Sequence, residues 1–261
     1  MKTRRVVSMN IRRCRGDDGK NIWANRRPLL ADVLKKYHPD IIGFQEVLIH
    51  QLKDLIRMFP DYQYVGVGRD DGKEAGEFSP IFFSRNLNIE QSDTFWLSDT
   101  PEIPSCTWGG QTRICTWAVI SEPIPFAFLN THIEYEFIQA QINSMELLIN
   151  KAKEYEDSMP LLLIGDFNCR PGSKPYKILS ASMRDSYLED PRNKEDRFVS
   201  SHGFTGLKLA TGQTKEGRID YIWIKGDVHV EQCCILFDHP GDDPDLYPSD
   251  HWPIMCDISF G

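Results

Sequence analysis

The sequence of 261 residues lacks several features that would each define a class of protein. No apolar run approaches the roughly 18 to 20 residues that cross a bilayer, so the sequence predicts no transmembrane helix and no membrane contact. The basic N-terminal stretch is not followed by an apolar segment of about 7 to 15 residues, and we expect no secretory signal. Internal repeats, low-complexity tracts and Gly/Ser linkers are also missing, which argues against a solenoid or a string of tethered modules.

The cysteines are irregularly spaced. The seven cysteines are odd in number and form no CxxC motif, with only Cys233 and Cys234 adjacent. This pattern excludes a disulfide framework and a thiolate zinc cluster. We therefore expect reduced thiols in a cytoplasmic protein, and nothing in the sequence indicates an obligate protein partner.

Positive charge is also in short supply, with 30 basic against 38 acidic residues and a net charge of −8. A non-specific DNA binder relies on attraction to phosphates and is usually basic, so the composition argues against that class. Phosphate chemistry stays open, because a bound divalent cation reverses the local field. The segment 2–36 is basic, and we interpret it as a solvated face rather than a binding stripe.

Short apolar or alternating segments recur along the whole chain and predict about ten strands. They are residues 4–11, 40–47, 62–68, 79–85, 113–120, 126–133, 160–167, 218–225, 230–237 and 251–260. The segments 218–225 and 230–237 are expected to pair as a hairpin across Gly226 and Asp227. Many strands with few helices predict two packed sheets covered by helices, in one domain spanning residues 1–261.

Helical spacing of apolar residues is clearest in three segments, 26–37, 47–59 and 136–155. Pro28 lies near the expected start of the first, and Pro60 ends the second. Ile56 in the second helix and Ile138 in the third are expected on the apolar faces. We interpret all three stripes as core-facing.

Polar side chains recur where predicted strands end or begin. They are Asn10, Glu46, His132, Asp166, Asn168, Asp220, Asp250 and His251. Each has an ordinary explanation alone, because Asn and Asp close turns and a histidine at a strand end is commonly structural. Two sheets packed face to face bring strand ends to one edge, so the set is able to converge. Its composition suits the hydrolysis of a phosphoester.

A hard cation such as Mg²⁺, or Mn²⁺ in its place, prefers oxygen ligands and keeps several waters. Glu46 suits that task, with Asn10 beside it and Asp250 as a further ligand. One carboxylate and a substrate phosphate are then enough to complete such a site. The sequence therefore predicts a metal-dependent phosphoester hydrolase.

The remaining polar residues match the other parts of such a reaction. Asp166, fixed by Asn168, is suited to align a water and take its proton. Cationic or hydrogen-bonding side chains would stabilise the negative charge on the attacked phosphate, and the candidates are His132, His251 and Arg113. A histidine in this role is usually oriented by a carboxylate, and Asp220 is the candidate.

The motifs SMNI, GFQEV, NTHIEY, IGDFNCRPGS, GRIDYIW and PSDHWPI follow one another in this order from Asn10 to Pro253. With this series the chain resembles the endonuclease/exonuclease/phosphatase superfamily, which shares the deoxyribonuclease-like fold. The segment 95–120 is similar to short bacterial members and, more loosely, to the deadenylase-like branch. The resemblance implies an α/β four-layer sandwich of two face-to-face, mostly antiparallel β-sheets flanked by helices.

The resemblance also implies roles for individual residues. Asn10 and Glu46 would hold the metal environment with Asp250 nearby. Asp166 would activate the water, assisted by Asn168. His251, paired with Asp220, would stabilise the attacked phosphate. The remaining implied contacts to the substrate phosphate come from His132, steadied by Glu77, and from Arg113 and Asn10.

Two departures from the nuclease branch bear on the substrate. Arg12 stands where abasic-site nucleases carry an acidic residue, and no Lys/Arg-rich insertion of the kind that grips duplex DNA is present. Trp108 is expected near the pocket, either stacking on a base or sugar or packed beneath a loop. Substrate choice is expected to lie in the loops 69–79, 99–111, 185–201 and 237–249.

Three hypotheses follow. The first is a Mg²⁺- or Mn²⁺-dependent phosphodiesterase or nuclease acting on a nucleotide or on single-stranded nucleic acid. The second is a phosphomonoesterase for a small soluble sugar, inositol or nucleotide phosphate. The third, a non-catalytic binding module that keeps the fold, is disfavoured because every acidic and histidine position of the motif series is present.

Overall fold

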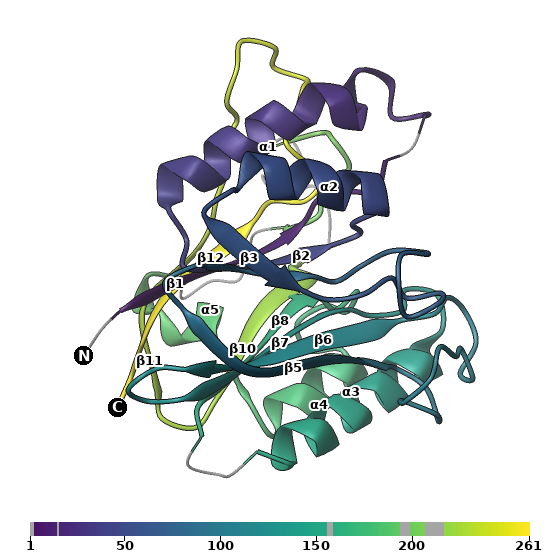
Figure 1. The fold of residues 1–261 in the computed structure, drawn as a ribbon, viewed down its shortest axis with the longest axis vertical. Helices are drawn as coiled ribbons and strands as arrows, with labels where there is room; N and C mark the ends of the chain where they lie inside the picture. Colours follow the sequence, from purple (N-terminus) through teal and green to yellow (C-terminus); the bar gives the residue numbers. More distant parts are fainter. Residues whose placement is uncertain (1–2, 15, 156–158, 194–198, 207–216) are drawn as a thin grey trace.

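The computed structural model describes residues 3–14, 16–155, 159–193, 199–206 and 217–261. Over these residues the strands form two six-stranded sheets that face each other (Figure 1). The first has the order β11-β12-β1-β2-β4-β3, and the second β5-β6-β7-β8-β10-β9.

The bounds of the strands of the first sheet are β1 (Arg4–Asn10), β2 (Ile41–Gln45), β3 (Tyr62–Val65), β4 (Ile81–Ser84), β11 (Val228–Ile235) and β12 (Ile254–Phe260). Those of the second sheet are β5 (Asn88–Trp96), β6 (Ile114–Ser121), β7 (Phe126–His132), β8 (Leu161–Asp166), β9 (Arg184–Asp185) and β10 (Asp220–Lys225).

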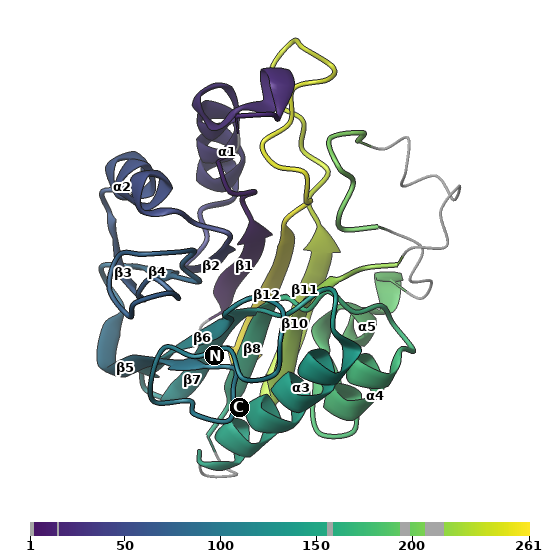
Figure 2. The same ribbon diagram turned by 90° about the vertical axis from the view of Figure 1, so that its right-hand side faces the viewer.

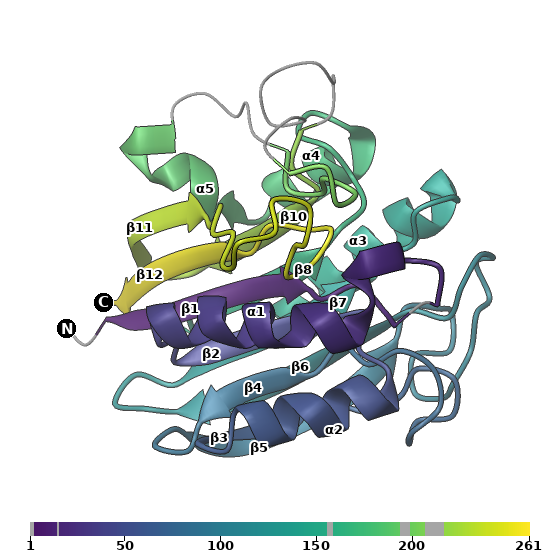
Figure 3. The same ribbon diagram turned by 90° about the horizontal axis from the view of Figure 1, so that it is seen from above.

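Helices cover the outer faces of both sheets. The first sheet carries α1 (Trp23–Tyr37) and α2 (Ile49–Met58), and the second carries α3 (Ile138–Lys153) and α4 (Lys174–Ser180). Figure 2 shows these two pairs on opposite sides of the sheets, and Figure 3 shows α1 and α2 lying along the strands beneath them. Shorter helical turns are η1 (Gly19–Asn21), α5 (Ser186–Glu189) and η2 (Pro191–Asn193). The predicted four-layer sandwich is confirmed.

Alternation along the central strands explains why they are apolar on both faces. In β1, Val6 packs between the sheets, whereas Val7 packs with the cluster under α1 and α2. In β8, Leu162 and Ile164 face the other sheet, and Leu163 faces the cluster under α3 and α4. Strands buried on both faces are near-continuous apolar runs, which is how the segment 160–164 appears in the sequence.

Two parallel strand pairs bring the polar strand ends to one edge. β1 pairs in parallel with β2, and β7 in parallel with β8, with His132 opposite Asp166. β10 runs antiparallel to β8, and its first residue, Asp220, also lies opposite Asp166. The carboxyl ends of four strands and the start of a fifth therefore meet at the same edge.

The hairpin expected across Gly226 and Asp227 is wrong. β10 pairs with β8 and β9 in the second sheet, whereas β11 pairs with β12 in the first. The short turn at Gly226, where φ is +78°, carries the chain from one sheet to the other. A short turn joins two strands without deciding that they pair, and here the pairing partners come from distant parts of the chain.

Two residues expected on core-facing stripes are exposed. Ile56 is 39% exposed and Ile138 is 56% exposed. Ile56 follows the buried Leu55 directly, and successive helical residues point about 100° apart, so both cannot face the sheet. α1 also begins earlier than predicted, at Trp23, with Pro28 inside the helix.

The strands β5 and β9 were not predicted. β5 is an edge strand whose first six residues are mostly polar and solvent-facing, so it lacks the apolar signal of the buried strands. Among the described helices, none combines the length and apolar character needed to cross a membrane.

Candidate active site

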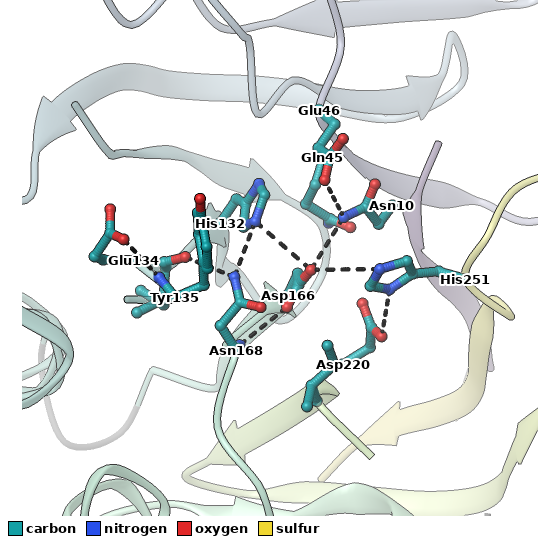
Figure 4. Close-up of polar contacts among 12 residues, drawn as sticks. Asn10, Gln45, Glu46, His132, Glu134, Tyr135, Asp166, Asn168, Asp220 and His251 are labelled. Carbon is teal, nitrogen blue, oxygen red and sulfur yellow. Dashed lines mark hydrogen bonds and ion pairs between the residues drawn. The ribbon is translucent and has the colours of Figure 1, made fainter. Parts of the chain in front are cut away.

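A cavity of about 280 Å³ opens at the edge where the polar strand ends meet. Eight of the ten predicted site residues line it: Glu46, Glu77, Arg113, His132, Asp166, Asn168, Asp250 and His251. The other two, Asn10 and Asp220, are buried and hydrogen-bond to lining residues. The convergence expected from the sequence is therefore present (Figure 4).

The amide of Asn10 joins the carboxylates of the two sheets. Its Nδ2 donates to Glu46 Oε1 at 3.1 Å and to Asp166 Oδ2 at 3.0 Å. The other oxygen of Glu46 accepts the backbone N–H of Arg13 at 2.9 Å. Burial acts to raise the pKa of Glu46, but this N–H, the charge of His251 and the Asn10 amide together lower it. Glu46 is therefore ionised at neutral pH.

Backbone strain is concentrated around this carboxylate pair. Glu46, Asn168 and Arg12 have φ values of +60°, +47° and +57°, in the left-handed region that residues with a side chain seldom adopt. Each such residue costs about 1–2 kcal/mol. The left-handed conformation at Glu46 and Asn168 turns the chain sharply at the ends of β2 and β8. Both side chains thereby line the cavity.

Asn168 fixes both Asp166 and His132. Its backbone N–H donates to Asp166 Oδ1 at 2.9 Å, and its Nδ2 donates to the Ile133 carbonyl at 2.9 Å. The same Nδ2 lies 3.1 Å from His132 Nε2. Burial and the charges of Arg113 and Arg69 hold the pKa of His132 well below its usual value. His132 is therefore neutral, with Nε2 as acceptor and its proton on Nδ1.

His251 is held between two carboxylates. Its Nδ1 lies 2.9 Å from Asp220 Oδ2, and its Nε2 lies 3.9 Å from Asp166 Oδ2. Burial acts to lower the pKa of His251, but Asp220, then Asp166 and Asp250, outweigh it and raise that pKa well above its usual value. The expected pairing of Asp220 with His251 is confirmed, and the imidazole is protonated at neutral pH.

Two buried carboxylates of the site resist ionisation. Burial, followed by the charge of Asp220, raises the pKa of Asp166 to about 7. Burial and Glu46 raise the pKa of Asp250, against the opposing charges of His251 and Arg12. Asp250 Oδ2 lies 3.6 Å from Arg12 Nη1. The cavity wall thus holds more negative charge than its hydrogen bonds compensate.

That excess negative charge is what a divalent cation would relieve. Ligand atoms of Asp166, Asp220 and His251 lie within 4.8 Å of one another, and Asp220 Oδ1 has no hydrogen-bond partner among the described residues. Because His251 Nδ1 is already bonded to Asp220, the oxygens of Glu46, Asp166 and Asp250 match a hard cation better. The donor set therefore fits a divalent metal.

Glu77 does not contact His132, contrary to expectation. Its carboxylate accepts from Arg13 Nη1 at 3.0 Å and from Arg69 Nη1 at 2.7 Å. Two guanidinium groups compensate a buried carboxylate better than a neutral imidazole does. His132 is fixed by Asn168 instead, and its Nδ1 has no hydrogen-bond partner in the described part of the chain.

Arg113 is a buried cation with little compensation. Its Nε and Nη1 make no hydrogen bond to any described residue, and the nearest carboxylate oxygen, Oε2 of Glu134, lies 3.7 Å from Nε. Burial, and then the charge of Arg69, lower its pKa. A guanidinium in this state, lining a cavity, is suited to bind an anion.

Sequence reasoning missed four residues around Arg113: Arg13, Arg69, Gln111 and Glu134. Arg69 Nη2 donates to Gln111 Oε1 at 2.8 Å, and the Gln111 backbone N–H donates to Glu134 Oε2 at 2.8 Å. Arg69 and Gln111 lie in the loops 69–79 and 99–111, which were expected to determine substrate choice. Of the loop 185–201, for which the same was expected, residues 194–198 lie outside the described residues. Such loop contacts have no periodicity that would mark them in the sequence.

Trp108 is packed rather than presented to the cavity. It is half-buried against the cluster under α3 and α4, and its Nε1 donates to Asp99 Oδ1 at 2.8 Å. A larger cavity of about 660 Å³ lies elsewhere, with Phe95, Trp96, Trp117 and Tyr155 in its wall. It contains none of the polar strand-end residues, so the smaller cavity is the candidate active site.

The fold, the converged strand ends and the motif order place the chain among proteins of the endonuclease/exonuclease/phosphatase fold. The chain belongs to the Endonuclease/Exonuclease/phosphatase family, whose family model matches residues 7–251. This family acts hydrolytically on phosphoesters, and the resemblance seen in the sequence is confirmed.

Particular relatives cover almost the whole chain. A mannosyl-6-phosphatase of Bacteroides thetaiotaomicron is 31% identical, with a TM-score of 0.86 over 98% of this chain and 99% of that one. An uncharacterised protein of Acanthamoeba polyphaga mimivirus is 31% identical over 89% of this chain and 91% of its own length. Human Nocturnin is 24% identical over 91% of this chain, which spans only 58% of Nocturnin. The Nocturnin catalytic domain with bound sulfate has a TM-score of 0.77 at 19% identity over 99% of this chain and 94% of that one, a likeness of fold alone.

Proposed function

We propose that this protein is a divalent-metal-dependent hydrolase of phosphomonoesters, acting on the terminal phosphate of a small molecule such as a sugar phosphate. The observation that carries the proposal is the buried guanidinium of Arg113, whose Nε and Nη1 make no hydrogen bond to any described residue. It lies beside a cavity that also holds Asp166 and His251. A terminal phosphate carries about 1.5 to 2 negative charges at neutral pH, and a diester carries only one. A small cavity rich in arginine favours the more highly charged group.

The surroundings agree with a small substrate. The chain has a net charge of −8 and lacks a basic insertion for gripping a polynucleotide. Arginine side chains nevertheless gather at the cavity, where Arg12, Arg13 and Arg113 line the wall and Arg69 lies behind Glu77. The arginines are thus gathered around one small cavity, alongside the carboxylates that a metal would compensate, which suits one phosphate rather than a chain of them. The relationship to a mannosyl-6-phosphatase, 31% identical, supports the same substrate class.

The reaction is an in-line displacement at phosphorus. Glu46, with Asp250 and Asn10, would hold Mg²⁺ or Mn²⁺, which supplies charge neutralisation for the phosphate when bound. Asp166, fixed by Asn10 and Asn168, accepts a proton from the attacking water. The new bond forms between the water oxygen and phosphorus as the bond to the leaving oxygen breaks, and that oxygen leaves as an alcohol after taking a proton from solvent.

Cationic and hydrogen-bonding groups on the other walls stabilise the charge on the phosphate oxygens. Protonated His251, oriented by Asp220, donates from Nε2, and His132 donates from Nδ1. Arg113 adds a fixed positive charge that needs no reorganisation during the reaction. Each of these groups is buried before the substrate arrives.

The phosphodiesterase hypothesis is the second candidate, favoured by the ordered motif series shared with deoxyribonuclease-like and deadenylase-like members. Parallel assays of mannose 6-phosphate, glycerol 3-phosphate, bis(p-nitrophenyl) phosphate, single-stranded RNA and single-stranded DNA separate the two. Each is run with Mg²⁺, with Mn²⁺ and with a chelator. Turnover confined to the diesters would replace the proposal with the second candidate.

The roles are tested by Asp166→Asn and His251→Gln, each of which should lower kcat by about 10²- to 10⁴-fold. The chain offers a matched control in the exposed pair Asp227 and His229, whose Oδ1 and Nε2 are 3.1 Å apart. Asp227→Asn and His229→Gln should leave kcat unchanged. Near-full activity of either site variant would remove that residue from the mechanism.

A further inference from the structure

An aromatic side chain, that of Tyr135, lies exposed at the cavity, and its hydroxyl interacts with the neighbouring Glu136. Tyr135 lines the cavity and is 53% exposed. It lies three residues after His132, the last residue of β7, in the loop that leads to α3. Large exposed apolar surfaces beside a site commonly mark a place where a ligand packs.

The backbone that carries Tyr135 is held rigidly by Glu134. Glu134 Oε1 accepts the backbone N–H groups of Tyr135 and Glu136, both at 2.9 Å. Its Oε2 accepts the backbone N–H of Gln111, and the Gln141 side chain donates to the Glu134 carbonyl at 2.8 Å. Both the loop 99–111 and the start of α3 are therefore tied to this one buried residue.

The turn at Gly110, which lies against Glu134, has no space for a larger residue. A side chain at Gly110, where φ is +78°, would meet the Glu134 carboxylate at 2.5 Å. The turn thus lies directly against Glu134, and the position of Tyr135 is fixed relative to Arg113 and the rest of the wall. Figure 4 draws Tyr135 and Glu134 on the side of Asp166 that carries His132 and Asn168, away from Asp220 and His251.

The size and lining of the cavity indicate what would lie on the tyrosine. A volume of about 280 Å³ is at the lower limit of pockets for drug-sized ligands, roughly 300–1,000 Å³, and suits a phosphate with one small ring. Gln111, Asn168 and Ser201 also line it and offer amide and hydroxyl groups. An aromatic face with polar groups around it matches a pyranose, whose C–H face is apolar and whose hydroxyls point outward.

We propose that Tyr135 is a specificity-determining residue, whose ring packs against a pyranose ring in the leaving group of the substrate, with Glu134 as its positioning residue. This inference rests on the proposed phosphomonoesterase function. Tyr135 selects what is attached to the phosphate, whereas Arg113, His132 and His251 bind the phosphate itself.

The test compares two phosphomonoesters that differ only in the leaving group, mannose 6-phosphate with a ring and glycerol 3-phosphate without one. Tyr135→Ala should raise KM for mannose 6-phosphate about tenfold, the effect of losing one stacking contact, and change kcat less than about threefold. KM for glycerol 3-phosphate should stay the same, and Tyr135→Phe should restore the ring preference. Glu134→Gln should reduce the same preference, because it loses one charged acceptor for the loop.

Phe137→Ala is the matched control. Phe137 is also an exposed aromatic residue in this loop, 47% exposed, but it does not line the cavity. It should leave both KM values unchanged. Equal changes for the two substrates in Tyr135→Ala, or the same ring preference in Tyr135→Ala and wild type, would overturn the inference.

A binding experiment separates this inference from the proposed function. The affinity of mannose 6-phosphate for wild type and for Tyr135→Ala is measured calorimetrically in the presence of a chelator, where no turnover is required. Weaker binding to the variant supports the packing of Tyr135 against the sugar ring, even if wild type hydrolyses no phosphomonoester. In that case the proposed function alone fails. Equal binding to both, or none to wild type, overturns the role of Tyr135.

Discussion

The Nδ1 atom of His251 lies 2.9 Å from Oδ2 of Asp220, a residue 31 positions earlier that opens β10. His251 lies near the end of the loop that leads to β12, which belongs to the other sheet. The pair therefore joins the two sheets at the site edge. It also decides the charge of the imidazole, because Asp220 is the largest of the influences that raise the pKa of His251.

Removing that carboxylate should change the pH dependence of catalysis. In Asp220→Asn, burial is opposed by fewer negative charges, so the pKa of His251 falls toward or below its usual value. Above that lower pKa the imidazole is neutral and cannot stabilise the phosphate. We expect kcat to fall about 10²- to 10⁴-fold at pH 8, with a smaller loss at pH 6.

The measurement is the pH profile of kcat on the best substrate of the panel, for the variant and for the surface control Asp227→Asn. The alkaline limb should move to lower pH in Asp220→Asn only. An unshifted limb with a uniform loss would mean that Asp220 acts on structure rather than on the charge of His251.

Glu46 should govern metal affinity. Glu46→Gln removes one ionised oxygen from the donor set while keeping the size of the side chain and its acceptor oxygen for the Arg13 N–H. We expect the Mg²⁺ concentration for half-maximal activity to rise at least tenfold, about the loss caused by removing even a group outside the metal's direct ligands. High Mg²⁺ should partly restore activity.

Thermal shift titration with Mg²⁺ checks the same affinity without turnover, because a ligand that binds only the folded state raises Tm. Glu146→Gln, an exposed glutamate on α3, is the control and should titrate like wild type. An identical Mg²⁺ dependence in Glu46→Gln would place the metal elsewhere.

Arg113 should lower the stability of the folded protein while supporting its activity. Arg113→Met removes a buried charge whose Nε and Nη1 make no hydrogen bond to described residues. Glu134 keeps three backbone donors in its absence, from Gln111, Tyr135 and Glu136. We expect kcat/KM to fall about 10²- to 10³-fold. Tm should rise by a few degrees, since each kcal/mol shifts it by about 2–4 °C in a chain of this size.

Arg27→Met is the control, because it removes an exposed and paired arginine rather than a buried one. Arg27 is exposed and its Nη1 lies 2.8 Å from Asp54 Oδ2, so its loss should leave activity unchanged and Tm equal or slightly lower. A fall in Tm for Arg113→Met would show that the buried guanidinium stabilises the fold, and would weaken the case for an anion site.

His202 should make the fold sensitive to acid. The ring is buried, stacks on Trp252 with centroids 4.3 Å apart, and its Nδ1 accepts the Gly206 N–H at 3.1 Å. Burial, and then His251, lower the pKa of His202 to about 3. Below its usual pKa of about 6.5 the unfolded chain takes up a proton that the folded protein refuses, so stability falls as the pH drops toward 3.

This one group contributes up to about 1.4 kcal/mol per pH unit to that loss. His202→Asn keeps an acceptor for Gly206 but does not titrate, and should flatten the pH dependence of the free energy of unfolding between pH 6 and 4. The measurement is urea denaturation at several pH values, with His229→Gln to control for the loss of an exposed histidine. Parallel curves for wild type and His202→Asn would contradict the assignment.

Local pattern was enough to predict most of the residues that converge at the candidate site. Asp166 and Asn168 follow an apolar run that only a buried strand explains, and Asn10 and Glu46 end two further runs of the same kind. Because parallel strands end at one edge, the position of a residue in its own strand carries information about its neighbours in space. The two sheets, their helical covers and the converging carboxylates are consequences of that pattern.

The tertiary structure alone decided which residues touch. β10 and β11 adjoin in the chain yet lie in different sheets, because pairing depends on the distant strands β8 and β12. Glu77 is bound by Arg13 and Arg69 rather than by His132, since a buried carboxylate is stabilised by whichever cations the loops bring to it. The sequence by itself determined the chemical groups at the strand ends, whereas the packing of loops such as 99–111 decided their charges, their partners and the exposure of Tyr135.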